Sequence, residues 1–194
     1  HLDFKLNEDS TLIHSRLAMT PNAAADNTNG SRADLFLNGR EDIKLVSVSV
    51  AGKQLSPGAD GYSLTPKSLT ISGSALPAGN WELEIVTEVK PQENSLLEGL
   101  YKSGGNYCTQ CEAEGFRGIT FFLERPDVMA KYTTRIEADK ASYPVLLGNG
   151  NLVDSGDLDG GRHYAVWEDP FNKPCYLFAL VAGNLAMQEG TFKT

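Results

Sequence analysis

The stretch Trp81-Glu82-Leu83-Glu84-Ile85-Val86-Thr87-Glu88-Val89 decides the fold class of this chain. Large apolar side chains occupy most of its odd positions, and glutamates occupy three of its four even positions. Side chains two residues apart share one face of an extended chain, whereas a helix has a period of about 3.6 residues. The stretch therefore predicts a β-strand with one face in a core and the other in water.

The same period of two recurs on both sides of this stretch. It predicts strands at Leu2–Leu6, Leu12–Met19, 45–50, Leu69–Ile71 and Tyr132–Asp139. In the strand 45–50, Val46, Val48 and Val50 are expected to share one face. The run from Tyr176 to Ala182 is apolar throughout, which is typical of a strand covered on both faces.

Turn residues separate these segments, and helical patterns are scarce. Asn38-Gly39, Pro57-Gly58 and Gly148-Asn149-Gly150 are typical of turns, and Pro21–Ser31 is typical of a loop. A short helical turn is predicted at Pro126–Ala130, because proline suits the start of a helix. We therefore predict an all-β fold, a β-sandwich or open barrel of many short strands, with at most one or two short helical turns.

The composition is that of a globular protein with an acidic balance. The chain has 194 residues, of which 41% are hydrophobic and 22% charged, and its net charge is -8. This length suits one domain. The negative charge argues against nucleic acid or an anionic membrane as a partner and favours cationic ligands such as peptide amino termini. No apolar run approaches the ~18 residues that span a bilayer. Because an alternating pattern begins at Leu2, we expect the chain to be part of a longer protein.

The cysteines do not form a recognisable metal or redox motif. Cys108 and Cys111 form one Cys-x-x-Cys pair, and Cys175 is distant in sequence. A structural zinc site usually takes four ligands, commonly from two such pairs. A thioredoxin-like motif would need a strand–helix setting, and the surroundings predict strands. We therefore predict no metal in this chain and three reduced thiols, which suit a reducing compartment.

The segment Gly99–Asp127 is where a functional site is predicted. It places Gln110, Glu112 and Glu114 at alternate positions. If this part of the chain is extended, the three polar side chains share one face, and the two residues between them face the other way. Such a face is either a solvated sheet surface or the wall of a binding site, and the spacing alone does not choose between them.

Two blocks of sequence carry a family resemblance. The first is Cys-Thr-Gln-Cys-Glu-Ala-Glu-Gly-Phe-Arg (Cys108–Arg117), followed by Phe-Leu-Glu-Arg-Pro-Asp (Phe122–Asp127). The second comprises Tyr143–Asn151, Gly161–His163, Trp167–Phe171 and Lys173–Gly183. These blocks closely resemble the N-terminal domain of the aminopeptidase N family of gluzincin zinc metallopeptidases, in its bacterial and plastid-type branch. The resemblance is dense from Leu97 to Gly183 and weaker before it.

The resemblance implies a domain of an enzyme rather than a complete enzyme. The family binds zinc through His-Glu-x-x-His in a catalytic domain, and neither that motif nor the family's Gly-x-Met-Glu-Asn segment occurs here. It implies that residues 1–194 form a single saddle-shaped N-terminal β-domain, which lies over a thermolysin-like catalytic domain and has no catalytic residue of its own. For the parent protein it implies zinc in the catalytic domain, peptide amino termini as substrate, and a location in the cytoplasm or plastid stroma.

The resemblance also implies roles for two residues. Glu112 matches the family glutamate that holds the free α-ammonium group of the peptide, and Gln110 matches the glutamine that lines the pocket for the first side chain. A carboxylate binds an ammonium group through a charge-assisted hydrogen bond, so Glu112 would set the distance between the peptide amino terminus and the zinc. An unusual backbone at Glu112, with a cis peptide bond to Ala113, is implied as well.

Structural roles are predicted for other side chains, and other functions stay open. Glu114 is expected to pair with Arg117 or Arg125, and Trp167 and Phe171 are expected in the core or at a domain interface. One alternative is a non-enzymatic scaffold descended from an aminopeptidase. Another is a stand-alone carbohydrate-binding sandwich, which would expose aromatic side chains on a platform.

Overall fold

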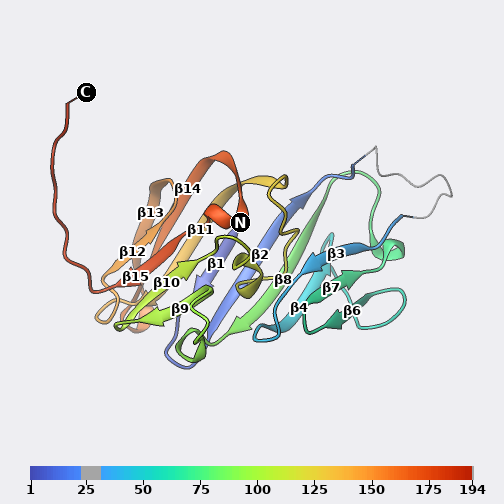
Figure 1. The fold of residues 1–194 in the computed structure, drawn as a ribbon, viewed down its shortest axis with the longest axis horizontal. Coiled ribbons are helices and arrows are strands. Elements are labelled where there is room, and N and C mark those ends of the chain that lie inside the picture. Colours follow the sequence, from blue (N-terminus) through green and yellow to red (C-terminus); the bar gives the residue numbers. More distant parts are fainter. Residues whose placement is uncertain (23–31, 194) are drawn as a thin grey trace.

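The computed structural model describes residues 1–22 and 32–193, and in this part of the chain fifteen strands form three sheets (Figure 1). The largest sheet has the strand order β13-β14-β11-β1-β2-β8-β4-β5, and a four-stranded sheet has the order β12-β15-β10-β9. A three-stranded sheet has the order β3-β7-β6. In chain order the strands are β1 (Leu2–Lys5), β2 (Thr11–Met19), β3 (Leu35–Asn38), β4 (Lys44–Val50), β5 (Lys53–Gln54), β6 (Tyr62–Thr65), β7 (Ser68–Ile71), β8 (Trp81–Val89), β9 (Gly99–Ser103), β10 (Asn106–Gln110), β11 (Met129–Asp139), β12 (Val145–Gly148), β13 (Asn151–Leu158), β14 (Arg162–Pro174) and β15 (Leu180–Gly183).

The all-β prediction is confirmed. The two smaller sheets lie in front of the large sheet in Figure 1, and one cluster of buried apolar residues joins all three. Helical structure in the described residues is limited to five 3-10 turns rather than one or two: η2 (Gly73–Ala75), η3 (Pro91–Glu93), η4 (Phe116–Gly118), η5 (Asp159–Gly161) and η6 (Cys175–Leu177). None of the described helical segments is long and apolar enough to cross a bilayer.

The strand interiors follow the predicted alternation. In β8 the residues Leu83, Ile85 and Thr87 are buried, while Glu84 and Val86 between them are only partly buried. In β11 the residues from Tyr132 to Ala138 alternate in the same way. Since a side-chain period of two fixes which face is covered, these two strands set the orientation of the large sheet.

Three local predictions need correction. In β4 a bulge between Leu45 and Ser47 leaves Val46 half exposed, so it does not share the buried face of Val48. A bulge adds one residue to one strand and shifts the alternation. The apolar run from Tyr176 to Ala182 contains the η6 turn and becomes a strand only at Leu180. The turn predicted at Pro126–Ala130 ends early, because β11 begins at Met129. The loop predicted at Pro21–Ser31 lies almost entirely outside the described residues.

The first strand lies between two strands that are far apart in the chain. β1 pairs antiparallel with β2 and parallel with β11, so that Leu2 lies opposite both Ser15 and Thr134. Beneath this pairing, Phe4 stacks on Phe178 with ring centroids 5.8 Å apart. The packing therefore connects the large sheet to the segment that leads into β15.

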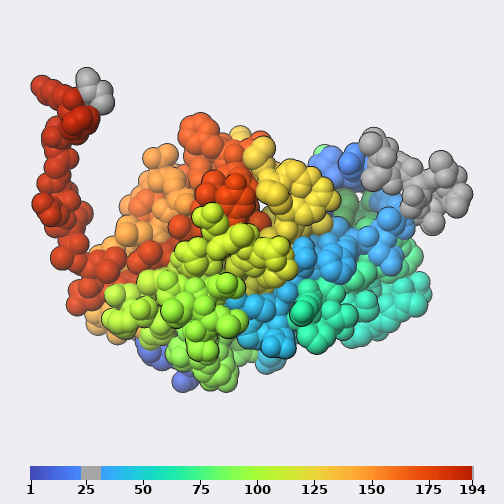
Figure 2. All heavy atoms as spheres, viewed as in Figure 1, coloured from blue at the N-terminus to red at the C-terminus, as the bar shows by residue number. Residues whose placement is uncertain are grey.

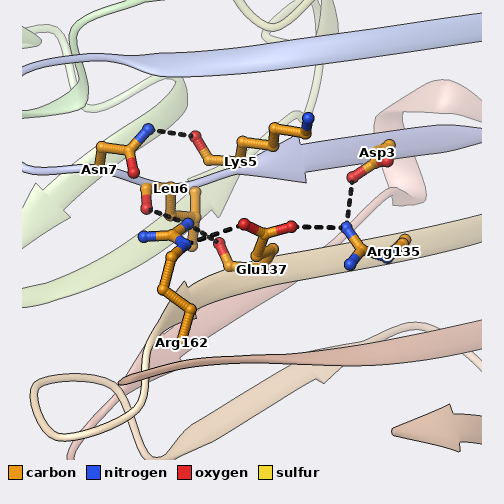
Figure 3. Close-up of polar contacts among 7 residues, drawn as sticks. All are labelled: Asp3, Lys5, Leu6, Asn7, Arg135, Glu137 and Arg162. Atoms are coloured by element: carbon orange, nitrogen blue, oxygen red, sulfur yellow. Dashed lines mark hydrogen bonds and ion pairs between the residues drawn. The ribbon is translucent and has the colours of Figure 1, made fainter. Parts of the chain in front are cut away.

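A network of four charged side chains supports the parallel pair (Figure 3). Arg135 lies 3.1 Å from the carboxylate of Asp3 and 2.9 Å from that of Glu137, and Arg162 donates to Glu137 at 2.8 Å. Arg162 also donates to the backbone carbonyl of Leu6 at 3.1 Å. Burial by itself would raise the pKa of Glu137, but the hydrogen bonds from the two arginines outweigh burial and lower the pKa.

We expect Glu137→Gln to lower the free energy of unfolding by about 2–3 kcal/mol at neutral pH, because two half-buried guanidinium groups lose their shared carboxylate. The pKa of Glu137 is lower in the folded state than its ordinary value near 4.5, so its contribution is present above that value and is lost as the pH falls through the folded pKa. Urea unfolding at pH 7 and below pH 4 should therefore show a difference between the proteins that shrinks in acid.

The matched control is Glu88→Gln, which removes a carboxylate that pairs with the exposed Lys44 at 2.8 Å. Exposed pairs contribute little to stability. Equal losses for Glu88 and Glu137 would show that the network behaves like an ordinary surface ion pair.

Candidate functional site

The predicted polar residues lie on a turn rather than along a strand. β10 ends at Gln110, Cys111 is buried, and the chain then reverses so that the amide of Gly115 donates to the carbonyl of Cys111 at 2.9 Å. Residues 112–114 are all exposed. The expectation of one polar and one opposite strand face is therefore wrong beyond Gln110, because the alternation continues into a turn.

The two predicted binding residues meet on this turn. The amide nitrogen Nε2 of Gln110 donates to the carbonyl of Glu112 at 3.1 Å. The peptide bond between Glu112 and Ala113 is cis, so that prediction is confirmed. No residue in the described part of the chain forms a hydrogen bond or ion pair with the carboxylate of Glu112, which is exposed. Glu112 thus presents a free acceptor to a cationic group.

Close backbone packing holds the turn against β9. A Cβ atom at Gly115 would lie 2.3 Å from the carbonyl oxygen of Gln110 and 3.1 Å from the nitrogen of Gly99. Gly99 has a φ of +70°, which glycine adopts without steric cost. Two glycines therefore allow the end of the turn to contact the start of β9.

The segment after the turn is anchored on all three sheets. Gln110 ends a strand of the four-stranded sheet, and Thr87 of the large sheet donates to the carbonyl of Ile119 at 2.9 Å. Asn38 of the three-stranded sheet exchanges two backbone hydrogen bonds with Phe122, of 2.8 and 3.1 Å. Figure 2 shows parts of the segment 110–125, in yellow-green and yellow, at the surface of the viewed face, while most of its residues after 114 are buried. The turn that carries Glu112 is therefore fixed relative to the whole domain.

A buried carboxylate and an arginine lie beside the turn. Glu124 is 8% exposed and accepts hydrogen bonds from Nε of Arg117 and, at 3.3 Å, from its backbone amide. A guanidinium nitrogen of Arg117 lies 3.2 Å from the carboxylate of Glu114, which confirms the prediction that Glu114 pairs with an arginine. Arg125 pairs instead with Asp127. The alternation of polar and apolar residues around Glu124 gives no sign that this glutamate is buried, so it was not among the predicted residues.

Trp167 belongs to the core, whereas Phe171 does not. The indole nitrogen of Trp167 donates to the carbonyl of Leu146 at 3.1 Å, and its ring packs against the core. Phe171 is 76% exposed, on a bulge of β14 that is spanned by the ion pair of Asp169 and Lys173. A core position for Phe171 is therefore wrong, and a domain interface stays a prediction.

The cysteines are free thiols and do not suit a metal. Burial raises the pKa of Cys111, and burial with the nearby charge of Glu124 raises the pKa of Cys175 to about 12. Metal ligation needs the thiolate. Among the residues that the structure describes, no three metal-ligating side chains gather at one place. The residues that the structure describes therefore offer no set of ligands for a zinc ion.

Comparison with known proteins gives the family of this all-β domain. Residues 27–177 match the Peptidase M1 N-terminal domain, and the chain belongs to that family. It is 47% identical over 193 residues to aminopeptidase N of Escherichia coli (strain K12) and 48% identical to aminopeptidase N of Caulobacter vibrioides. Each alignment covers 100% of this chain but 21% of the relative, so the chain spans about a fifth of these proteins.

Solved structures share the fold. The chain superposes with a TM-score of 0.83 and 36% identity on aminopeptidase A of Legionella pneumophila in complex with aspartic acid, over 96% of this chain and 21% of that one. An M1 zinc metallopeptidase from Deinococcus radiodurans, bound to a Tyr-ser-ala substrate, gives a TM-score of 0.73 at 14% identity. That match covers 94% of this chain and 40% of the other and supports the fold alone.

We expect Gly115→Ala to destabilise the domain by about 1–3 kcal/mol. The added methyl group would collide with the carbonyl oxygen of Gln110, a backbone atom that cannot rotate away. Gly190→Ala is the control, because nothing lies within 4 Å of a Cβ atom at that position. Denaturant unfolding measures both variants. A Gly115→Ala protein as stable as the Gly190→Ala protein would show that the turn is not held by this contact.

Proposed function

We propose that this chain is the N-terminal domain of a zinc aminopeptidase that removes amino acids from the amino terminus of peptides, and that Glu112 holds the substrate α-ammonium group. The observation that carries the proposal is the exposed carboxylate of Glu112, which no described residue pairs with, on a turn anchored on all three sheets. The names of the relatives, which include two aminopeptidases N, support the reaction class.

The chemistry of the turn suits an ammonium group. A carboxylate and an ammonium form a charge-assisted hydrogen bond that is about twice as strong as a neutral one. It gains further strength where a closed site excludes water. A fixed turn would hold the peptide amino terminus at one distance from the reacting bond, which favours removal of one residue at a time. Gln110, which already donates to the carbonyl of Glu112, would line the space for the first side chain.

The proposal places zinc and the catalytic groups in the part of the parent protein that lies outside this chain. The chain spans 21% of the curated relatives, which leaves room for a catalytic domain on which this domain would act as a cap. Phe171, exposed on its bulge, is a candidate contact to that domain. The free thiols favour a reducing compartment such as the cytoplasm or plastid stroma.

The alternative functions have less support. A carbohydrate-binding platform would expose aromatic rings, but Trp81 and Trp167 are both partly buried and pack against the core. The non-enzymatic scaffold differs from the proposal in the sequence that follows residue 194 in the parent. An intact His-Glu-x-x-His there would exclude the scaffold, and its absence would favour it.

For the isolated chain we expect neither stoichiometric zinc nor hydrolysis of amino-acid anilides, because its residues provide no metal-binding cluster in the described region. Elemental analysis and a chelator-treated activity assay check this. One zinc per chain, or chelator-sensitive activity that copurifies with it, would contradict the assignment of the zinc to another domain.

In the full-length parent protein we expect Glu112→Gln to lower kcat/KM for unblocked peptides by about 30- to 1,000-fold, because the ammonium group loses its ionic partner in a closed site. The melting temperature should hardly change, since this carboxylate has no partner within the described domain. Steady-state kinetics and thermal unfolding of the same preparation measure the two effects.

The matched control is Glu114→Gln, a neighbouring glutamate that pairs with Arg117. Its loss should reduce kcat/KM less than about tenfold, because its charge is already compensated. A Glu112→Gln enzyme with near-normal kcat/KM would contradict the proposal that Glu112 holds the amino terminus.

A further inference from the structure

We infer that Arg117 is a positioning residue for Glu112. It joins the turn to the buried carboxylate of Glu124 and compensates the charge of Glu114, so that Glu112 is the carboxylate of the turn that remains for a peptide ammonium group. The inference rests on the proposed function and adds to it the residue that places the binding carboxylate.

The contact between Arg117 and Glu124 is largely buried. The side chain of Glu124 is 3% exposed, and that of Arg117 is 23% exposed. Both a side-chain and a backbone nitrogen of Arg117 donate to the two carboxylate oxygens of Glu124. A buried carboxylate is costly unless it is paired and hydrogen-bonded. The position of Glu124 beneath the segment therefore determines where Arg117 lies.

Backbone hydrogen bonds connect Arg117 to the turn that carries Glu112. Arg117 lies in the 3-10 turn η4, which directly follows Gly115, and the amide of Gly118 donates to the carbonyl of Gly115 at 3.0 Å. Gly115 in turn closes the reversal by donating to Cys111 at 2.9 Å. A shift of Arg117 would therefore move the end of the turn that carries Glu112.

The charge of Arg117 distinguishes the two glutamates of the turn. Glu112 and Glu114 are both exposed and two residues apart, so two carboxylates would otherwise compete for one ammonium group at different distances from the reacting bond. Arg117 lies 3.2 Å from the carboxylate of Glu114, whereas no described residue pairs with that of Glu112. Glu114 therefore already has a cationic neighbour, and we infer that this difference favours Glu112 as the partner of the ammonium group. Correct placement matters, because a misplacement of about 1 Å can reduce a rate by about a hundredfold.

The test is a double-mutant cycle in the full-length parent protein, with Arg117→Gln, Glu112→Gln and the double variant. We expect Arg117→Gln to lower kcat/KM for an unblocked dipeptide about tenfold or more. In the Glu112→Gln background the same change should cost less than about twofold, because a residue that acts through Glu112 has nothing left to position. Its effect on the melting temperature should be the same in both backgrounds.

Two further variants keep the test decisive. Arg117→Lys retains the positive charge near Glu114 and should recover part of the lost kcat/KM, and it replaces Arg117→Gln throughout the cycle if that protein does not fold. Arg125→Gln is the matched control, since this exposed arginine lies on the same segment and pairs with Asp127. It should stay within about twofold of the unmodified enzyme.

The possible outcomes separate the inference from the proposed function. An unchanged kcat/KM for Arg117→Gln, or an equal loss with and without Glu112, would overturn the positioning role while the role of Glu112 stands. A normal kcat/KM for Glu112→Gln would overturn the proposed function, whatever Arg117 does. A loss that disappears in the Glu112→Gln background supports both.

Discussion

The large sheet depends on the parallel pairing of β1 with β11, which joins residues that are far apart in the chain. β1 is four residues long, and such a short parallel pair adds little stability by itself. The alternating charges of Asp3, Arg135, Glu137 and Arg162 tie the pair together from the side, and the stacking of Phe4 on Phe178 supports it from the core. Every other strand of the large sheet extends outward from this seam.

The candidate site uses the rigidity that this arrangement provides. Within the segment 110–125, three consecutive exposed side chains occur only on the turn at 112–114. The residues after the turn form hydrogen bonds with Thr87 of the large sheet and with Asn38 of the three-stranded sheet. Since each sheet contributes a hydrogen bond or a strand to the segment, the backbone that carries Glu112 cannot shift relative to one sheet without straining its contacts with another. A flexible glutamate at the tip of an unanchored loop would lose more conformational entropy on binding a ligand.

Period-two spacing was enough to predict β1, β2, β4, β7, β8 and β11, but it did not indicate β13 or β14 at one side of the large sheet. The family resemblance pointed to Gln110 and Glu112. Local spacing failed where the backbone changes shape without changing composition: the bulge that exposes Val46, and the reversal after Gln110. Local spacing also failed to predict the burial of Glu124, which pairs with Arg117. A salt bridge that compensates a buried charge cannot be recognised from the alternation of apolar and polar residues. These features are set by tertiary contacts, which a single sequence does not display.

The seam between β1 and β11 also governs the order in which the chain can fold. Asp3 and Arg135 are 132 positions apart, so β1 emerges from the ribosome long before its parallel partner exists. Early in synthesis, β2 can pair with one edge of β1, and β8 can pair with the other edge of β2. The edge of β1 that faces β11 in the finished sheet keeps its backbone groups unpaired during this time. Contacts of such long range slow folding, and open edges favour association between nascent chains. The domain therefore passes through a stage of synthesis in which one edge of β1 is exposed to other unfolded chains.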